Sequence, residues 1–235
     1  FVEGRNGFEA ALSDDQWIEF GAALKAIHTV TLPPTLQGRI GPETYTPRWR
    51  EMVGNFQAQV EHTTYADPVA AEMAAFMQAH REEIRLVIER AEQLASTLQS
   101  QPLERVLCHS DVHAGNLLLS ASGDLYIVDW DNPILAPKER DLMFIGGGVG
   151  DIWNSSREEH LFYRGYGSKD VDLTALTYYR YERIIQDIAA YCQEILLTEE
   201  GGADRKQGLY YFTSQFMAGG VLEIACETDR MLKAG

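Results

Sequence analysis

The chain has 235 residues, 45% of them hydrophobic, and carries a formal net charge of −15 at pH 7. This length suffices for one substantial domain with its own core, whereas the acidic excess opposes binding to nucleic acid, which requires a basic surface. No apolar run approaches the length of a membrane-spanning helix, and three cysteines without C-x-x-C spacing argue against a disulfide framework and for a reduced, cytoplasmic protein.

The first hundred residues are predicted to be mostly helical. A capping-box pattern, S-D-D-Q, opens a helix over residues 13–28, and a second helix is expected around 48–61. An Asp-Pro pair is typical of a helix start and opens a helical pattern over 67–98. This pattern forms either one long helix or two helices with a break near His80.

Three short apolar runs follow and predict strands. The first covers residues 105–108, and the other two, 116–119 and 125–128, are joined by the turn-forming residues S-A-S-G-D and therefore read as a β-hairpin. Further helices are expected at 157–163, 172–197 and 205–232. The predicted fold class is α+β, mostly α-helical, with a small β-hairpin.

The hairpin brings together polar residues that suit phosphoryl transfer. Asp111 and Asn116 lie five residues apart on one loop, and Asp129 follows Asn116 by thirteen residues, at the end of the second hairpin strand. The hairpin would hold Asn116 and Asp129 at one end, near the loop that carries Asp111. A kinase site needs a carboxylate at the substrate hydroxyl and two oxygen ligands for Mg²⁺, and these three side chains supply them.

A second interpretation of the same loop is a transition-metal site. His109, Asp111 and His113 offer three potential ligands on alternate residues, as in a metal-dependent hydrolase. This hypothesis leaves the hairpin from Asn116 to Asp129 unexplained, and the remaining histidines are scattered among helical patterns.

The sequence H-S-D-V-H-A-G-N, followed by I-V-D-W, resembles the aminoglycoside phosphotransferase and choline kinase-like family, whose active site resembles that of protein kinases. The family pattern is H-x-D-x-x-x-x-N, then a short hairpin, then an Asp. Two further segments are similar to the family: Ala22 to His28, at the end of a helix, and Pro137 to Leu142, in which the Asp has a structural role. Within the family, the chain resembles the spectinomycin phosphotransferase-like branch.

The resemblance implies roles for individual residues. Asp111 would be the catalytic base, Asn116 and Asp129 would hold Mg²⁺, and His109 would support the loop. The implied reaction transfers a phosphoryl group from ATP to a hydroxyl group of a small molecule, and antibiotic resistance is the implied biological role.

The resemblance also points to residues that bind the acceptor. Glu182 and Asp187 lie on a helix after the hairpin, where the family has its acceptor site, and Asp131 follows the metal Asp by two residues. These carboxylates would bind amines of a cationic acceptor, which the negative net charge would attract. The alternatives are a solvated helix face with charge pairs four residues apart, a turn residue, and a charge that serves solubility.

The family has a smaller N-terminal lobe that supplies a phosphate-covering loop and a Lys, and this chain shows neither. The glycine run at 146–150 follows the hairpin and has no adjacent Lys, so a loop is expected there. Phe1 and Val2 resemble the nucleotide hinge. We therefore expect a hinge segment at 1–12 and a helical C-terminal lobe at 13–235, with the catalytic loop and metal hairpin at 105–131.

Without the N-terminal lobe, an isolated C-terminal lobe is expected to be inactive, because this catalysis depends on positioning and charge stabilisation. A third hypothesis is a non-catalytic, kinase-like binding module that keeps the fold and transfers no phosphoryl group.

Overall fold

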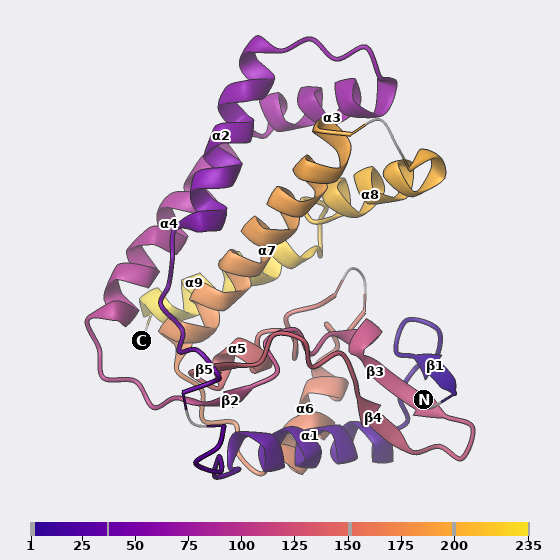
Figure 1. Cartoon of the computed structure of the whole chain (residues 1–235), viewed down its shortest axis with the longest axis vertical. Helices are drawn as coiled ribbons and strands as arrows, with labels where there is room; N and C mark the ends of the chain where they lie inside the picture. Colours follow the sequence, from indigo (N-terminus) through magenta and orange to yellow (C-terminus); the bar gives the residue numbers. More distant parts are fainter. Residues whose placement is uncertain (1–2, 37, 150–151, 199–200, 235) are drawn as a thin grey trace. The chain divides into compact units, whose positions relative to one another are not determined.

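The computed structural model describes residues 3–36, 38–149, 152–198 and 201–234, and helices predominate among them (Figure 1). The chain forms two compact units, each made of two segments. The first unit comprises Phe1–Thr44 and Pro102–Leu176, and the second comprises Tyr45–Gln101 and Thr177–Gly235. Phe1 and Val2, the predicted nucleotide hinge, lie outside the described residues.

The first unit contains all the described strands and three of the described helices. Its helices are α1 (Asp14–His28), α5 (Glu139–Leu142) and α6 (Ser156–Tyr166), and α7 (Leu173–Leu196) begins in it and continues into the second unit. Its strands are β1 (Gly4–Asn6), β2 (Val106–Cys108), β3 (Leu117–Ser120), β4 (Leu125–Ile127) and β5 (Ile134–Ala136), with a 3-10 turn, η1 (Ala114–Asn116), before β3.

Helices α1 and α6 lie side by side in the first unit (Figure 1). Two glycines allow their backbones to touch: a Cβ on Gly21 would lie 2.1 Å from the carbonyl oxygen of Phe162, and one on Gly165 would lie 1.9 Å from that of Ile18. Beside this crossing, the rings of Trp17 and Trp153 meet edge to face at 5.2 Å and both are buried. This aromatic core fixes α1, whose last residue reaches the candidate site.

The predicted hairpin is present. β3 and β4 pair antiparallel, with Leu117 opposite Ile127, and β1 extends the sheet on the other side of β3, with Gly4 opposite Ser120. Strand β2, predicted at 105–108, pairs antiparallel with β5 in a separate two-stranded ladder. Part of the segment expected to be a hinge is thus a strand of the hairpin sheet.

The second unit consists of helices in the part that the structure describes. They are α2 (Arg48–His62), α3 (Pro68–Ala79), α4 (Arg81–Gln99), the greater part of α7, α8 (Gly202–Ser214) and α9 (Val221–Ala234). The core of the unit is apolar: Met73 and Met77 of α3 are fully buried, and Cys192 of α7 contacts Met77.

The helix starts predicted from capping patterns are confirmed. Ser13 and Gln16 form a reciprocal capping box at α1, and the Asp67 side chain accepts the N–H of Ala70 at α3. Helices α3 and α4 are separate, with His80 between them.

The single helix predicted over 205–232 is wrong. Helix α8 ends at Ser214 and α9 begins at Val221, and Gly219 between them has a φ of 75°, which no residue in a right-handed helix adopts. Leu209 to Phe212 in α8 form a continuous apolar and aromatic run rather than one helical face, so periodicity did not locate the end of this helix. None of the helices in the described part of the chain combines the length and the apolarity that crossing a membrane requires.

Candidate active site

The loop from His109 to Asn116 is anchored at its start by one buried carboxylate. The backbone N–H groups of His109 and Ser110 donate to Asp141, at 2.9 and 2.7 Å. Ser110 has a φ of 76°, in the left-handed region, which costs about 1–2 kcal/mol for a residue with a Cβ. The two charge-assisted hydrogen bonds offset this cost, and they set the direction in which the loop leaves β2.

Asp141 has a further partner on α1. His28, the last residue of α1, donates from Nε2 to Asp141 at 3.0 Å, and its Nδ1 accepts the hydroxyl proton of Tyr166 at 2.7 Å. All three side chains are buried, and burial raises the pKa of Tyr166 well above its ordinary value. The loop is thereby tied to α1 and α6.

Cys108 adjoins this cluster, and single donor atoms of His28, Cys108 and Asp141 lie within 4.8 Å of one another. Burial raises the pKa of the Cys108 thiol well above its ordinary value, so the thiolate that a metal requires is disfavoured. The Asp141 oxygens already accept three hydrogen bonds. We therefore assign the cluster to support of the loop rather than to metal binding.

His109 connects the loop to the hairpin. Its Nε2 donates to the carbonyl oxygen of Val128 at 2.8 Å, so in the neutral ring Nδ1 is an acceptor, and it accepts the N–H of Asp111 at 3.3 Å. The Trp130 ring packs edge-on at 4.6 Å, and only 1% of His109 is exposed. Both ring nitrogens are therefore in use, which argues against the metal-hydrolase hypothesis, since that hypothesis requires His109 as a ligand.

Asn116 joins the same two segments. The side-chain Nδ2 of Asn116 donates to the backbone carbonyl of Asp111 at 2.8 Å. The backbone carbonyl of Asn116 accepts the N–H of Val128 at 3.0 Å. Asn116 is buried. These bonds place Asn116 beside the loop that carries Asp111 and beside the residue that precedes Asp129.

The two candidate carboxylates are accessible, in contrast to the groups that hold them. The side chain of Asp111 is 44% exposed, and Asp129 is also exposed. Asp129 has a φ of 63°, a conformation that Asp tolerates better than most residues. Such strain, of order 1–3 kcal/mol, is typical of functional sites. Asp131, two residues further, is exposed as well.

The two predicted acceptor residues on α7 already have cationic neighbours within the second unit. Glu182 is 3% exposed and pairs with Arg50 at 2.5 Å, whereas Asp187 is partly exposed and pairs with Arg183 at 3.0 Å. Their roles toward an acceptor stay predictions.

The resemblance gave Asp141 a structural role, but sequence reasoning missed its hydrogen bonds to His28 and to the loop, and the contact of His28 with Tyr166. A signal independent of the resemblance is that this aspartate directly precedes the apolar run L-M-F-I, where a charge is costly without partners. Its partners lie 31 to 113 residues away in the sequence, so no local pattern identifies them.

Comparisons with known proteins identify the family of the chain. A model of the phosphotransferase enzyme family matches residues 1–172. The structure of spectinomycin phosphotransferase, APH(9)-Ia, in complex with ADP and spectinomycin is 42% identical in sequence, with a TM-score of 0.89 over 97% of this chain and 70% of that chain. The AMP-bound complex of the same enzyme is also 42% identical, with a TM-score of 0.86 over 96% of this chain and 70% of that chain.

A more distant structure extends the likeness of fold. An aminoglycoside phosphotransferase from Alicyclobacillus acidocaldarius is 10% identical, with a TM-score of 0.66 over 100% of this chain and 71% of that chain, and at this identity the match concerns the fold alone. The resemblance inferred from the sequence motifs is confirmed, and the chain belongs to the phosphotransferase enzyme family.

Proposed function

We propose that this chain is the catalytic C-terminal lobe of a small-molecule kinase that transfers the γ-phosphoryl group of ATP to a hydroxyl group of an amine-bearing acceptor. The observation that carries the proposal is the hydrogen-bonded connection between the loop and the hairpin. Asn116 bonds to the backbone of Asp111 on one side and to that of Val128 on the other, next to Asp129. One rigid frame thus carries a base and two oxygen ligands.

Asp111 is the proposed base. Its backbone is held by His109 and Asn116, while its carboxylate is accessible to a substrate. It would orient the acceptor hydroxyl and take its proton as the oxygen bonds to the γ-phosphorus and the bond from that phosphorus to ADP breaks. Because the transition state is loose, the proton moves late and the carboxylate needs no strongly raised pKa.

Asn116 and Asp129 are the proposed Mg²⁺ ligands, and their chemistry fits that ion. Asn116 directs its amide nitrogen toward a backbone carbonyl, which leaves the amide oxygen as the ligand atom, and Asp129 supplies an exposed carboxylate. When bound, Mg²⁺ neutralises charge that develops on the phosphate oxygens.

The acceptor class follows from the relatives and from the charge. Spectinomycin phosphotransferase is 42% identical to this chain and was crystallised with spectinomycin, so a spectinomycin-like aminocyclitol is our first candidate. A net charge of −15 favours a cationic acceptor of this kind. Asp131 and Asp187 are the candidate carboxylates for its amines, and Glu182 is a weaker candidate because Arg50 already neutralises it.

A smaller N-terminal lobe would complete the enzyme. This chain corresponds to 70% of the spectinomycin phosphotransferase chain, and no glycine-rich loop with an adjacent Lys precedes its hairpin. Such a lobe would supply the Lys for the nucleotide phosphates, and residues 1–12 would belong to the hinge. The ATP donor suits the cytoplasmic location expected from the cysteine pattern.

The test is acceptor-dependent release of ADP by the longest form of the protein that its coding sequence specifies, with ATP and Mg²⁺. The panel comprises spectinomycin, aminoglycosides, choline and amino-alcohols. ADP release that depends on one of these acceptors supports the kinase and names its substrate class. Nucleotide binding without turnover on any acceptor favours the binding module, and stoichiometric zinc or manganese in the purified protein would favour the hydrolase.

A further inference from the structure

The loop contains a second histidine, His113, to which the proposed mechanism gives no role. We propose that His113 is a positioning residue that holds one carboxylate oxygen of Asp111, so that the other oxygen faces the acceptor hydroxyl. This inference rests on the proposed function, because it assigns a role relative to the proposed base.

The tautomer of His113 follows from one hydrogen bond. The N–H of Gly115 donates to Nδ1 of His113 at 3.0 Å, at the start of the 3-10 turn η1. Nδ1 is therefore an acceptor and carries no proton in the neutral ring, so the proton lies on Nε2. The end of the ring that bears the donor is the end that faces Asp111.

The two side chains face each other within ion-pair range, just beyond hydrogen-bond length. Nε2 of His113 lies 3.6 Å from Oδ2 of Asp111. Hydrogen bonds in catalytic sites are often long before substrate binds and tighten in the substrate complex. The histidine side chain is 20% exposed and the carboxylate 44% exposed, so the donor is more enclosed than the group it would orient.

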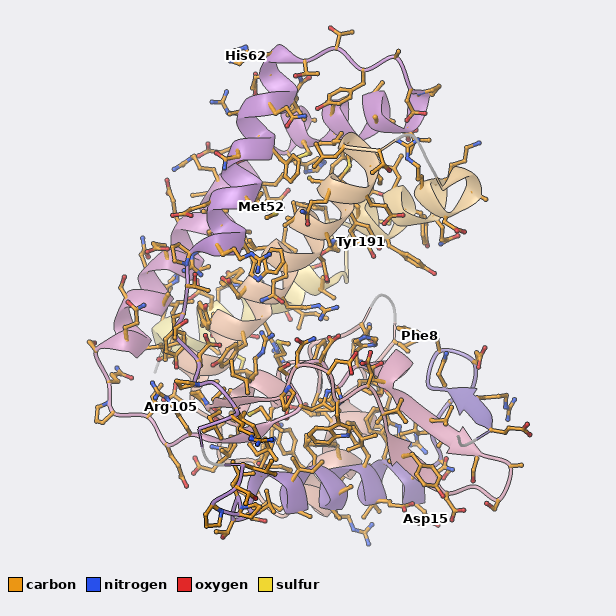
Figure 2. All side chains as sticks on the ribbon, in the orientation of Figure 1. Phe8, Asp15, Met52, His62, Arg105 and Tyr191 are labelled. Carbon is orange, nitrogen blue, oxygen red and sulfur yellow. The ribbon has the colours of Figure 1, made fainter. Side chains whose placement is uncertain are left out.

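The packing of the ring fixes its direction. The rings of Phe8 and Phe144 each lie 6.1 Å from the His113 ring, centroid to centroid. A Cβ on Gly115 would come within 2.7 Å of Cε1 of His113 and 3.2 Å of Phe8, so a larger residue there would displace the His113 ring. Figure 2 labels Phe8, which follows β1 and is 56% exposed. A ring held in this way needs little ordering when substrate binds.

The cap alone does not require histidine. Asn or Asp accept a backbone N–H at the start of a helical turn with one side-chain oxygen. Histidine differs in carrying a donor on the opposite end of a rigid ring, which is the end directed at Asp111. A substitution that keeps the cap but removes the Nε2 donor therefore distinguishes a positioning role of His113 from a purely structural one.

The matched variants are His113→Asn, which keeps an acceptor for Gly115 and removes the donor, and His160→Asn, which changes an exposed histidine on α6. The assay uses the longest form of the protein and the acceptor that supports turnover in the panel of spectinomycin, aminoglycosides, choline and amino-alcohols. His113→Asn is expected to lower kcat about 10- to 100-fold, as loss of a supporting hydrogen bond commonly does. The KM for ATP and the melting temperature should change little. His160→Asn should match wild type in kcat, in the KM for ATP and in melting temperature.

A lower melting temperature with unchanged kcat in His113→Asn would assign His113 to packing and overturn the proposal. A second measurement needs no variant: ¹⁵N NMR of histidine-labelled wild type should report a proton on Nε2 of His113, and a proton on Nδ1 would overturn the proposal as well. Absence of turnover in the wild type would reject the proposed function and, with it, the role of His113. Normal wild-type turnover with an unaffected His113→Asn rejects this inference alone.

Discussion

Buried carboxylates in the two units, Asp141 in the first and Glu182 and Asp229 in the second, differ in the groups that bind them. In the first unit, Asp141 accepts hydrogen bonds from two backbone N–H groups and from His28. In the second unit, Glu182 pairs with Arg50, and Asp229 pairs with Arg90. A carboxylate that binds backbone N–H groups fixes the conformation of a loop, whereas one that binds an arginine joins two helices.

This difference predicts different consequences of mutation. Loss of the first kind of contact should disturb catalysis, because the position of Asp111 depends on the loop. Loss of the second kind, such as the contact between Asp229 and Arg90, should lower the free energy of unfolding and leave kcat unchanged. The following changes test this contrast, from the largest expected effect to the smallest.

Asp111→Ala should lower kcat by about 10²- to 10⁴-fold, the usual contribution of a general base, and leave nucleotide binding intact. The residue is accessible, so its loss should leave the melting temperature nearly unchanged. Steady-state kinetics and nucleotide titration check both parts. Turnover like that of wild type would show that Asp111 is not the base.

Asp129→Ala should remove the Mg²⁺ dependence of nucleotide binding, because the variant loses a charged oxygen ligand. Calorimetric titration of nucleotide with and without Mg²⁺ measures the effect. The control is Asp124→Ala, which changes an exposed carboxylate in the hairpin turn. Equal metal dependence in wild type and Asp129→Ala contradicts the assignment.

Asp141→Ala should affect both activity and stability. It leaves the buried N–H groups of His109 and Ser110 without their acceptor, at about 1–3 kcal/mol for each group. We expect a clearly lower denaturation midpoint, and a lower kcat at temperatures where the variant is still folded. A lower denaturation midpoint with unchanged kcat would contradict the prediction that the contacts of Asp141 in the first unit serve catalysis.

Arg205→Met is the matching change in the second unit. Arg205 is 4% exposed and donates to the carbonyl oxygen of Ile195 at 2.7 Å and to Asp67 at 2.9 Å. Its loss should cost about 2 kcal/mol of unfolding free energy, typical of hydrogen bonds from a charged donor, with no change in kcat. A fall in kcat at a temperature where the variant is fully folded would show that the second unit's ion pairs also serve catalysis.

Asp67→Asn tests the same pair through pH. The hydrogen bond from Arg205 holds the pKa of Asp67 below its ordinary value of 3.8. A lowered pKa in the folded state adds stability that is complete above the unfolded value and is lost as pH falls through the folded value. Asn retains the cap of α3. The small difference in melting temperature between wild type and Asp67→Asn at pH 7 should therefore shrink toward pH 3, and a difference that grows would contradict the pairing.

The features that sequence reasoning predicted were local. The capping box at Ser13, the cap at Asp67 and the hairpin turn each depend on residues within a few positions, so their patterns are visible in the sequence. The candidate loop was found for the same reason, because Asp111 and Asn116 belong to one motif.

The features that sequence reasoning missed depend on distant partners or on backbone conformation. Arg50 and Glu182 are 132 residues apart, and His28 and Asp141 are 113 apart, so no periodicity connects them. The left-handed backbone of Ser110 is stabilised by the hydrogen bond from its N–H to Asp141, and the break between α8 and α9 depends on the left-handed backbone of Gly219, which the spacing of apolar residues does not reveal.

The most direct test of the central claim is to follow labelled γ-phosphate from ATP to spectinomycin in the longest form of the protein, with Mg²⁺, for wild type and Asp111→Ala. Our account predicts labelled spectinomycin with wild type and a loss of at least about 10²-fold with the variant. Label that reaches neither spectinomycin nor any other acceptor of the panel, or that reaches spectinomycin equally with both proteins, would contradict it.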